Sequence, residues 1–260
     1  MRSWRFTGQE FDILWSAYDR DRLPYPLAFR PTTAVGWDDL VRQRESAVEA
    51  LLGQYSENLE LALSTLLEPE ARVESKGFGG SGLTAVFRFH GAVRNGSGAT
   101  LVQLPGPAED TGGDVIMGLC APSEVATAAV AALPKAQAGK QPAVSFRRDE
   151  IAADRQRYSR RANEVSINEQ LNRMFKRDRT AVGEITVFPG PATDSRPTTD
   201  GRGFLWTDYA DDGRYYIKSG DPIVATPMSP TSMTNEIARL LDLTRRYYRM
   251  ENEQTKAALQ

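Results

Sequence analysis

The same succession of segments occurs twice in this sequence, and it restricts the fold more than any other feature. In each half, four segments with alternating polar and apolar residues precede an apolar helix. The best-matched parts read VIMGLCAPS at residues 115–123 and IVATPMSPT at residues 223–231. Each is an apolar strand followed by a proline with Ser or Thr, which is typical of a helix start. The sequence therefore predicts one pseudo-two-fold, internally duplicated domain over residues 1–260, with halves of about 1–140 and 141–260.

Strands and turns are predicted from the period-two pattern. In the first half we expect strands over residues 72–78, 83–94, 100–104 and 114–119. In the second half we expect them over residues 181–188, 203–209, 214–218 and 222–226. Glycine-containing turns separate them, including Gly77–Gly82 between the first two strands.

Helix starts are marked by capping residues. Residues 7–10 (TGQE) and 166–169 (SINE) both read as capping boxes. In a capping box the side chain of a Ser or Thr accepts a hydrogen bond from the backbone N–H of a Glu three residues later, and the Glu side chain accepts one from the backbone N–H of the Ser or Thr. Asp38 and Ser56 are predicted to cap two further helices, with Gly53 ending the first. The last helix is expected after Ser229. Between residues 146 and 179 we expect either two helices or one helix broken near Asn163.

Composition excludes several kinds of site. The chain has one histidine and one cysteine, which excludes an internal disulfide framework and multi-Cys or multi-His metal sites. Lysine and arginine together number 32 and aspartate and glutamate 34, so the formal charge of −2 gives no reason to bind nucleic acid. Neither a secretory signal peptide nor a stretch long enough to span a bilayer is predicted, and a cytoplasmic protein is the expectation.

Two patterns resemble catalytic motifs without their context. Gly77–Gly82 satisfies the dinucleotide-binding glycine spacing, but a strand-like segment follows where that motif needs a helix. A hairpin turn explains it better. His90 lies late in an alternating strand, and a packed or surface strand residue is the favoured interpretation. An α+β enzyme that uses His90 with an acidic partner is the alternative.

Large aromatic side chains are concentrated in the second-half strands, at Phe204, Trp206, Tyr209, Tyr215 and Tyr216. Phe204 and Trp206 alternate to one side of the sheet, and Leu205 and Tyr209 to the other. This pattern fits two interpretations: core packing on both faces, or a binding surface on one of them.

Residues 11–15 (FDILW) followed by residues 23–27 (LPYPL) resemble the opening of the EspG family. Residues 203–209 (GFLWTDY) and 213–216 (GRYY) resemble that family's late β-hairpin. EspG proteins are cytosolic chaperones of type VII (ESX) secretion systems. The resemblance extends over nearly the whole chain in length and element order.

The resemblance implies an α+β fold, with a central, mostly antiparallel sheet flanked by two helical bundles and with pseudo-two-fold symmetry. It implies binding to the apolar tip of a PE–PPE-type heterodimer, here called the client, which the chaperone keeps soluble and helps to target. No catalytic residue, metal or cofactor is implied. In the family the connection equivalent to Gly77–Gly82 is longer and contacts the client, so the short turn here is a departure.

The leading hypothesis is therefore a non-enzymatic chaperone that binds no nucleic acid and inserts in no membrane; a homodimer is left open. The predicted client-binding residues are Phe78, Trp206, Tyr209, Arg214, Tyr216, Leu243 and Tyr247. The runner-up is the enzyme based on His90. A nucleic-acid-regulating protein is a third option, which the charge balance disfavours.

Overall fold

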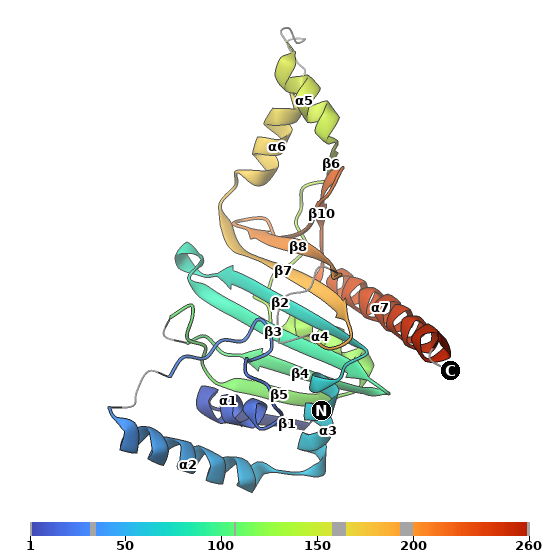
Figure 1. Cartoon of the computed structure of the whole chain (residues 1–260). Helices are drawn as coiled ribbons and strands as arrows, with labels where there is room; N and C mark the ends of the chain where they lie inside the picture. Colours follow the sequence, from blue (N-terminus) through green and yellow to red (C-terminus); the bar gives the residue numbers. More distant parts are fainter. Residues whose placement is uncertain (1, 32–34, 107, 158–164, 193–199, 259–260) are drawn as a thin grey trace.

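The fold is built on one sheet of ten strands, and every strand pairing in the described part of the chain is antiparallel (Figure 1). The computed structural model describes residues 2–31, 35–106, 108–157, 165–192 and 200–258. The first half contributes β1 (Arg2–Phe6), α1 (Gly8–Ser16), α2 (Trp37–Gln54), α3 (Glu57–Leu67), β2 (Ala71–Gly79), β3 (Ala85–Arg94), β4 (Ser97–Gln103), β5 (Val115–Cys120) and α4 (Val125–Ala131). The second half contributes β6 (Val144–Phe146), α5 (Arg148–Gln156), α6 (Ile167–Phe175), β7 (Arg179–Pro189), β8 (Arg202–Tyr209), β9 (Arg214–Ser219), β10 (Ile223–Pro227) and α7 (Pro230–Ala258).

The order of the strands is symmetrical about the β2–β7 pair. The sheet runs β1-β5-β4-β3-β2-β7-β8-β9-β10-β6, so each half has the same internal order, read outward from the centre. In both halves helices separate the outermost strand from the central one, and a further helix follows the last strand. The predicted α+β class and antiparallel sheet are confirmed. The internal duplication stays a prediction, and this strand order is compatible with it.

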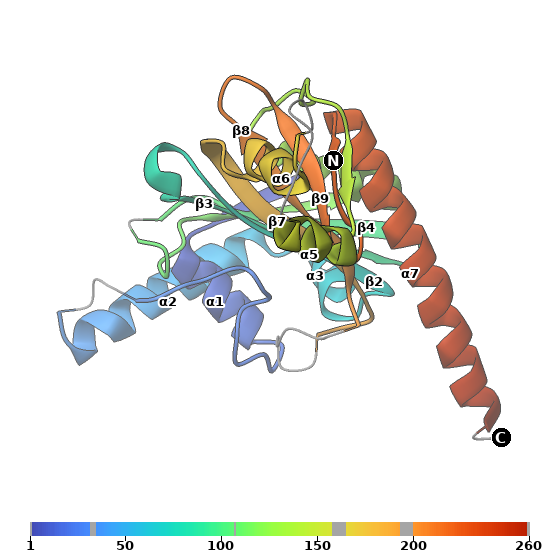
Figure 2. The same cartoon turned by 90° about the horizontal axis from the view of Figure 1, so that it is seen from above.

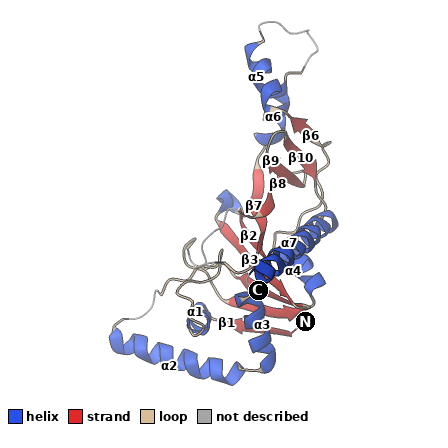
Figure 3. Ribbon diagram, turned by 45° about the vertical axis from the view of Figure 1, so that its right-hand side comes forward, coloured by secondary structure: helices blue, strands red, loops and turns tan. Residues whose placement is uncertain are grey.

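Helices pack on both faces of the sheet. Consecutive β3 residues point to opposite faces, and Val93 packs with α4 and α7 while Ala92 packs with α1 and α3. A third, smaller cluster joins Met174 of α6 to Tyr209 and Tyr215. Figure 2 shows the C-terminal part of α7 extending beyond the sheet. Figure 3 shows α5 and α6 projecting at the opposite end from α2. None of the described helices combines the length and apolar character needed to cross a membrane.

Most predicted helix starts are confirmed. Thr7 and Glu10 form the expected capping box, with Thr7 N–H donating to Glu10 Oε2 at 2.7 Å and Glu10 N–H donating to Thr7 Oγ1 at 3.2 Å. Ser166 and Glu169 form the second box, and Ser56 caps α3. The structure describes two helices, α5 and α6, between residues 146 and 179, whereas Asn163 lies outside the described residues.

Two expectations about local structure are wrong, and two short strands were missed. Asp38 does not cap α2, because the helix already begins at Trp37 with Gly36 at its N-cap. Gly53 does not end that helix, which continues to Gln54. The edge strands β1 and β6 were not predicted. β6 is only three residues long, and β1 is specified by its pairing with β5 rather than by a local pattern.

Candidate functional site

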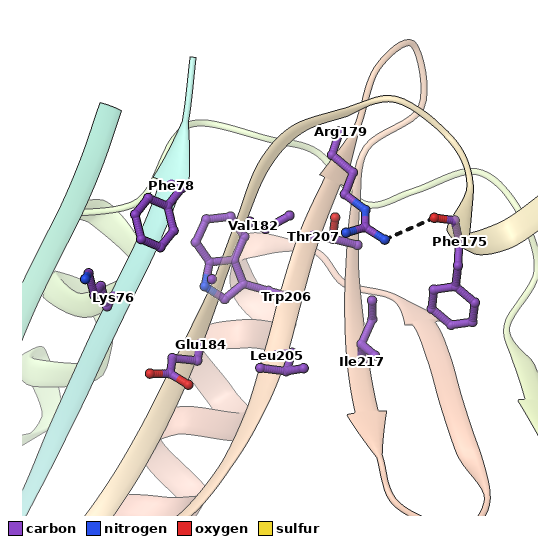
Figure 4. Close-up of a pocket in the computed structure, with 11 residues that line it drawn as sticks. Lys76, Phe78, Phe175, Arg179, Val182, Glu184, Leu205, Trp206, Thr207 and Ile217 are labelled. Atoms are coloured by element: carbon purple, nitrogen blue, oxygen red, sulfur yellow. Dashed lines mark hydrogen bonds between the residues drawn. The ribbon is translucent and has the colours of Figure 1, made fainter. Parts of the chain in front are cut away.

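An apolar groove lies over the middle of the sheet (Figure 4). Lys76 pairs with Arg88, which shares a face of β3 with Ala92, so the groove is on the face that carries α1 and α3. Strands β2, β7, β8 and β9 form its floor, and its volume is about 510 Å³. The residues that line it are Lys76, Phe78, Phe175, Arg179, Val182, Gly183, Glu184, Leu205, Trp206, Thr207 and Ile217. Figure 4 places Phe78 at one end and Phe175 of α6 at the other. Hereafter this set of residues is called the groove.

Alternation along the paired strands brings the groove side chains together. Phe78 pairs with Val182, and Val182 pairs with Thr207 on the next strand. Leu205 pairs with both Glu184 and Ile217. Because paired residues share a face of the sheet, these side chains project on one side. Leu205 is 42% exposed, which is unusual for a leucine in an interior strand, and it supplies accessible apolar surface in the groove.

The charged groups of the groove are held by partners at its borders. Tyr25 donates its hydroxyl proton to Glu184 Oε1 at 3.0 Å, and burial beside that carboxylate raises the pKa of Tyr25. Lys76 pairs with Glu109 at 3.3 Å, and its Nζ lies 5.1 Å from the centre of the Phe78 ring. Arg179 donates to the carbonyl of Phe175 at 3.0 Å. The groove is therefore apolar in its centre and polar at its rim, as in protein–protein interfaces.

Three residues predicted for a client surface are buried instead. Trp206 and Arg214 are each 1% exposed, and Tyr209 is also buried. Arg214 forms an ion pair with Asp208 at 2.7 Å, and its guanidinium lies 4.6 Å from the Trp206 ring centre. Tyr209 is covered by Arg177, 3.8 Å from its ring centre. These three side chains offer little surface to a client, because α7 covers Trp206 and α6 covers Tyr209. Their role in client binding stays a prediction.

The other predicted residues do not form one surface. Phe78 lines the groove, which Trp206 also borders, since its indole ring lies against Gly77 and Gly183. A Cβ atom at either glycine would come within 2.7 Å of Trp206 Cζ2, so both strands need glycine here. Tyr216 packs on Phe204 with ring centres 5.0 Å apart, in the cluster beneath α7. Leu243 and Tyr247 are exposed on α7. Their role in client binding stays a prediction.

His90 is a packed strand residue. Its side chain is 2% exposed, and its Nδ1 lies 2.8 Å from the carbonyl oxygen of Tyr25. A carbonyl only accepts, so Nδ1 carries the proton. Glu74, its β2 partner in the register, already binds Arg72 at 2.8 Å. His90 is not among the residues that line the groove. In the described residues, no group of three or more His, Cys, Asp or Glu could hold a metal ion.

The burial of His90 predicts a specific pH dependence of stability. Burial lowers the pKa of His90 to about 4, whereas an unfolded histidine has a pKa of about 6.5. The unfolded state therefore takes up the proton first as the pH falls. The stabilising effect is complete above pH ~6.5 and is lost between pH ~6.5 and ~4, with a total of about 3 kcal/mol.

Urea unfolding of the wild type and His90→Gln at pH 7.5 and pH 4.5 measures this effect. We expect the wild type to lose about 2–3 kcal/mol more than the variant between these pH values. Equal losses would contradict the burial of a neutral His90.

Most groove residues were not selected from the sequence. Val182, Leu205, Ile217 and Phe175 carry no motif. The available signal was the alternation in β8, which placed Leu205 on the side opposite to Phe204 and Trp206. That pattern shows that both sides of a strand are apolar, but it does not show which side a helix covers.

Known proteins match the chain at the level of family and fold. The model of the EspG family matches residues 7–239. A similar solved structure is the Mycobacterium tuberculosis type VII secretion system chaperone EspG5 in complex with the PE25–PPE41 dimer, with a TM-score of 0.56 and 12% identity. The similarity covers 94% of this chain and 96% of that one, and at this identity it shows a shared fold. No curated protein matches. With the family model spanning most of its length, this chain belongs to the EspG family.

Proposed function

We propose that this chain is a cytoplasmic, non-enzymatic chaperone of a type VII secretion system that binds PE–PPE-type heterodimers through the groove. The observation that carries the proposal is an open apolar groove in a member of the EspG family. The similarity to EspG5, which was solved with a PE–PPE dimer, supports the same class of client. The buried His90, which lies outside the groove, supports a role without catalysis.

The shape of the groove suits a protein client. An exposed apolar helical tip favours aggregation, and covering it needs aromatic and aliphatic contacts with a polar rim. The floor consists of paired strands, so the binding surface is organised before the client arrives and loses little conformational entropy on binding. A chaperone must also release its client, which favours moderate affinity and fast dissociation.

The turn between β2 and β3 borders this proposed site. It consists of a few residues, including a short 3₁₀ turn at Ser81–Leu83, and β2 and β3 pair as the predicted hairpin. In the family the longer equivalent connection contacts the client. Here Phe78, at the base of the turn, supplies that contact in our proposal. Leu83 has a φ of 58°, a left-handed conformation that is rare for a branched side chain and is found more often at functional sites.

The residues predicted to bind the client differ in their position relative to the groove. We take Phe78 as a direct client contact and add Leu205, Val182 and Ile217 from the floor. Leu243, Tyr247 and Tyr216 belong to α7 or to the sheet face beneath it, so they would meet a different part of the client. The duplicated strand order supports a single domain with pseudo-repeat halves of about 1–140 and 141–260.

Co-expression tests the proposed function. The tagged chain is produced with candidate PE–PPE pairs from its own genome, captured, and analysed by gel filtration with light scattering. We expect a soluble ternary complex with at least one pair, and the free chain in the same run reports whether it forms a homodimer. Failure to form a complex with any type VII substrate of that genome would contradict the proposal.

A further inference from the structure

A second pocket shares the lining residue Phe78 with the groove. Its volume is about 440 Å³, and the residues that line it include Phe78, Leu83, Val86, Arg88 and Glu109. Phe78 belongs to both sets of lining residues, so the two spaces are neighbours. Only this second pocket, here called the Arg88 pocket, contains a buried charge.

Arg88 is 3% exposed, and part of its hydrogen-bonding capacity is unused. Nη2 donates to the backbone carbonyl of Glu109. Nε and Nη1 are buried and have no acceptor in the described residues. A guanidinium is permanently charged, and buried charges in proteins are normally paired. Within the part of the chain that the structure describes, Arg88 forms no ion pair with a carboxylate, and its one acceptor is the neutral carbonyl of Glu109.

The charged neighbours of Arg88 are already engaged. Lys76 is its partner in the β2–β3 register, and the Glu109 side chain pairs with Lys76 at 3.3 Å. On the other side, Gln103 faces Arg88 across the β3–β4 pair and bonds the backbone of Ala28. Two cations, Lys76 and Arg88, therefore lie side by side in the register. Of the carboxylates beside Lys76, Glu109 forms its ion pair and Glu184 accepts from Tyr25.

We propose that the Arg88 pocket binds a carboxylate group, presented by an acidic side chain of the client that occupies the groove. This assignment rests on the proposed function. The planar guanidinium fork matches a carboxylate, and charge-assisted hydrogen bonds of this kind are the strongest that side chains form. Phe78, Leu83 and Val86 exclude water around the pair, and the contact through Phe78 joins it to the apolar site.

A small probe tests the pocket without a client. The probe is 4-phenylbutyrate, and 4-phenylbutyramide is its neutral counterpart; binding to the full chain is followed by calorimetry and NMR. We expect the carboxylate to bind at least tenfold more tightly than the amide. Arg88→Met and Arg88→Gln should abolish this preference, and the Gln variant retains a donor for the Glu109 carbonyl. The matched control is Arg94→Met on the same strand, where Arg94 is paired with Glu68 at 2.7 Å.

The possible results distinguish a failure of the Arg88 pocket proposal from a failure of the proposed function. Equal binding of carboxylate and amide, or an unchanged preference in folded Arg88 variants, would overturn the proposal. With a client that binds the wild type, we expect Arg88→Gln to weaken the complex at least tenfold and Arg94→Met to leave it within twofold. A carboxylate preference combined with unchanged client affinity would mean that the pocket takes a small carboxylate instead, which overturns the client assignment. If no PE–PPE client binds the wild type, the proposed function fails. The comparison of 4-phenylbutyrate with its amide still tests whether the Arg88 pocket binds a carboxylate.

Discussion

Replacing Leu205 with arginine is expected to weaken client binding at least ~100-fold. Leu205 is 42% exposed in the floor of the groove, between Glu184 and Ile217 in the strand register. A charge placed there loses its water when an apolar client covers it. The few hot-spot residues near the centre of an interface contribute ~2 kcal/mol or more, and we take Leu205 as one of them. The fold should tolerate the change, because an arginine can extend into solvent and pair with Glu184 across the strands.

The matched control is Leu52→Arg. Leu52 is 71% exposed on α2, so the same substitution adds the same charge to an accessible apolar residue outside the groove. Binding is measured by calorimetry or interferometry with a purified client, and circular dichroism checks the fold. We expect the control to stay within twofold of the wild type. An equal loss in both variants would indicate a non-specific charge effect, and no loss in Leu205→Arg would rule out the groove as the client site.

The second large effect concerns stability. Arg214→Ala is expected to lower the free energy of unfolding by about 3–5 kcal/mol, because it leaves Asp208 as a buried carboxylate without its partner. Arg214 is 1% exposed and bonds Asp208 through Nε and Nη2, each at 2.7 Å. It also donates to the carbonyl of Pro134 at 2.8 Å and lies over the Trp206 ring. The substitution thus removes contacts that join β8, β9 and the segment after α4.

Urea unfolding measures this loss, and an exposed pair provides the control. Arg246 pairs with Asp242 at 3.1 Å on the surface of α7, and Arg246→Ala should cost less than ~0.5 kcal/mol. The double variant Arg214→Met, Asp208→Leu should recover most of the stability, since apolar replacement of a buried ion pair is often neutral. A small loss in Arg214→Ala would mean that this pair is not buried in solution.

Local patterns predicted the elements of this fold well. The capping residues Thr7, Ser56 and Ser166 marked true helix starts. Each cap side chain accepts a hydrogen bond from the backbone N–H three residues later, so the interaction is local and can be predicted from the sequence. Period-two alternation located the other eight strands, because the alternation is itself a local pattern. It could not reveal β6, since three residues contain no measurable period, or β1, which depends on β5 more than one hundred residues later.

The site was harder to predict because it depends on which face each helix covers. Alternation separated Leu205 from Trp206, but the packing of α7 on the Trp206 side decides that Leu205 is the accessible one. Arg214 was predicted to be a client-binding residue, but it is 1% exposed. Its burial depends on the ion pair with Asp208, which lies opposite it across the β8–β9 hairpin. The Arg88 pocket has no local motif, because β2, β3 and the segment after β4 meet only in the folded chain.

The most direct test of the groove as the client site is photocrosslinking from position 205. A benzoylphenylalanine is placed at residue 205 in one sample and at residue 52 in another, and each is irradiated with a bound PE–PPE client. The account predicts a crosslink to the client from position 205 and none from position 52. A crosslink from position 52, with none from position 205, would contradict it.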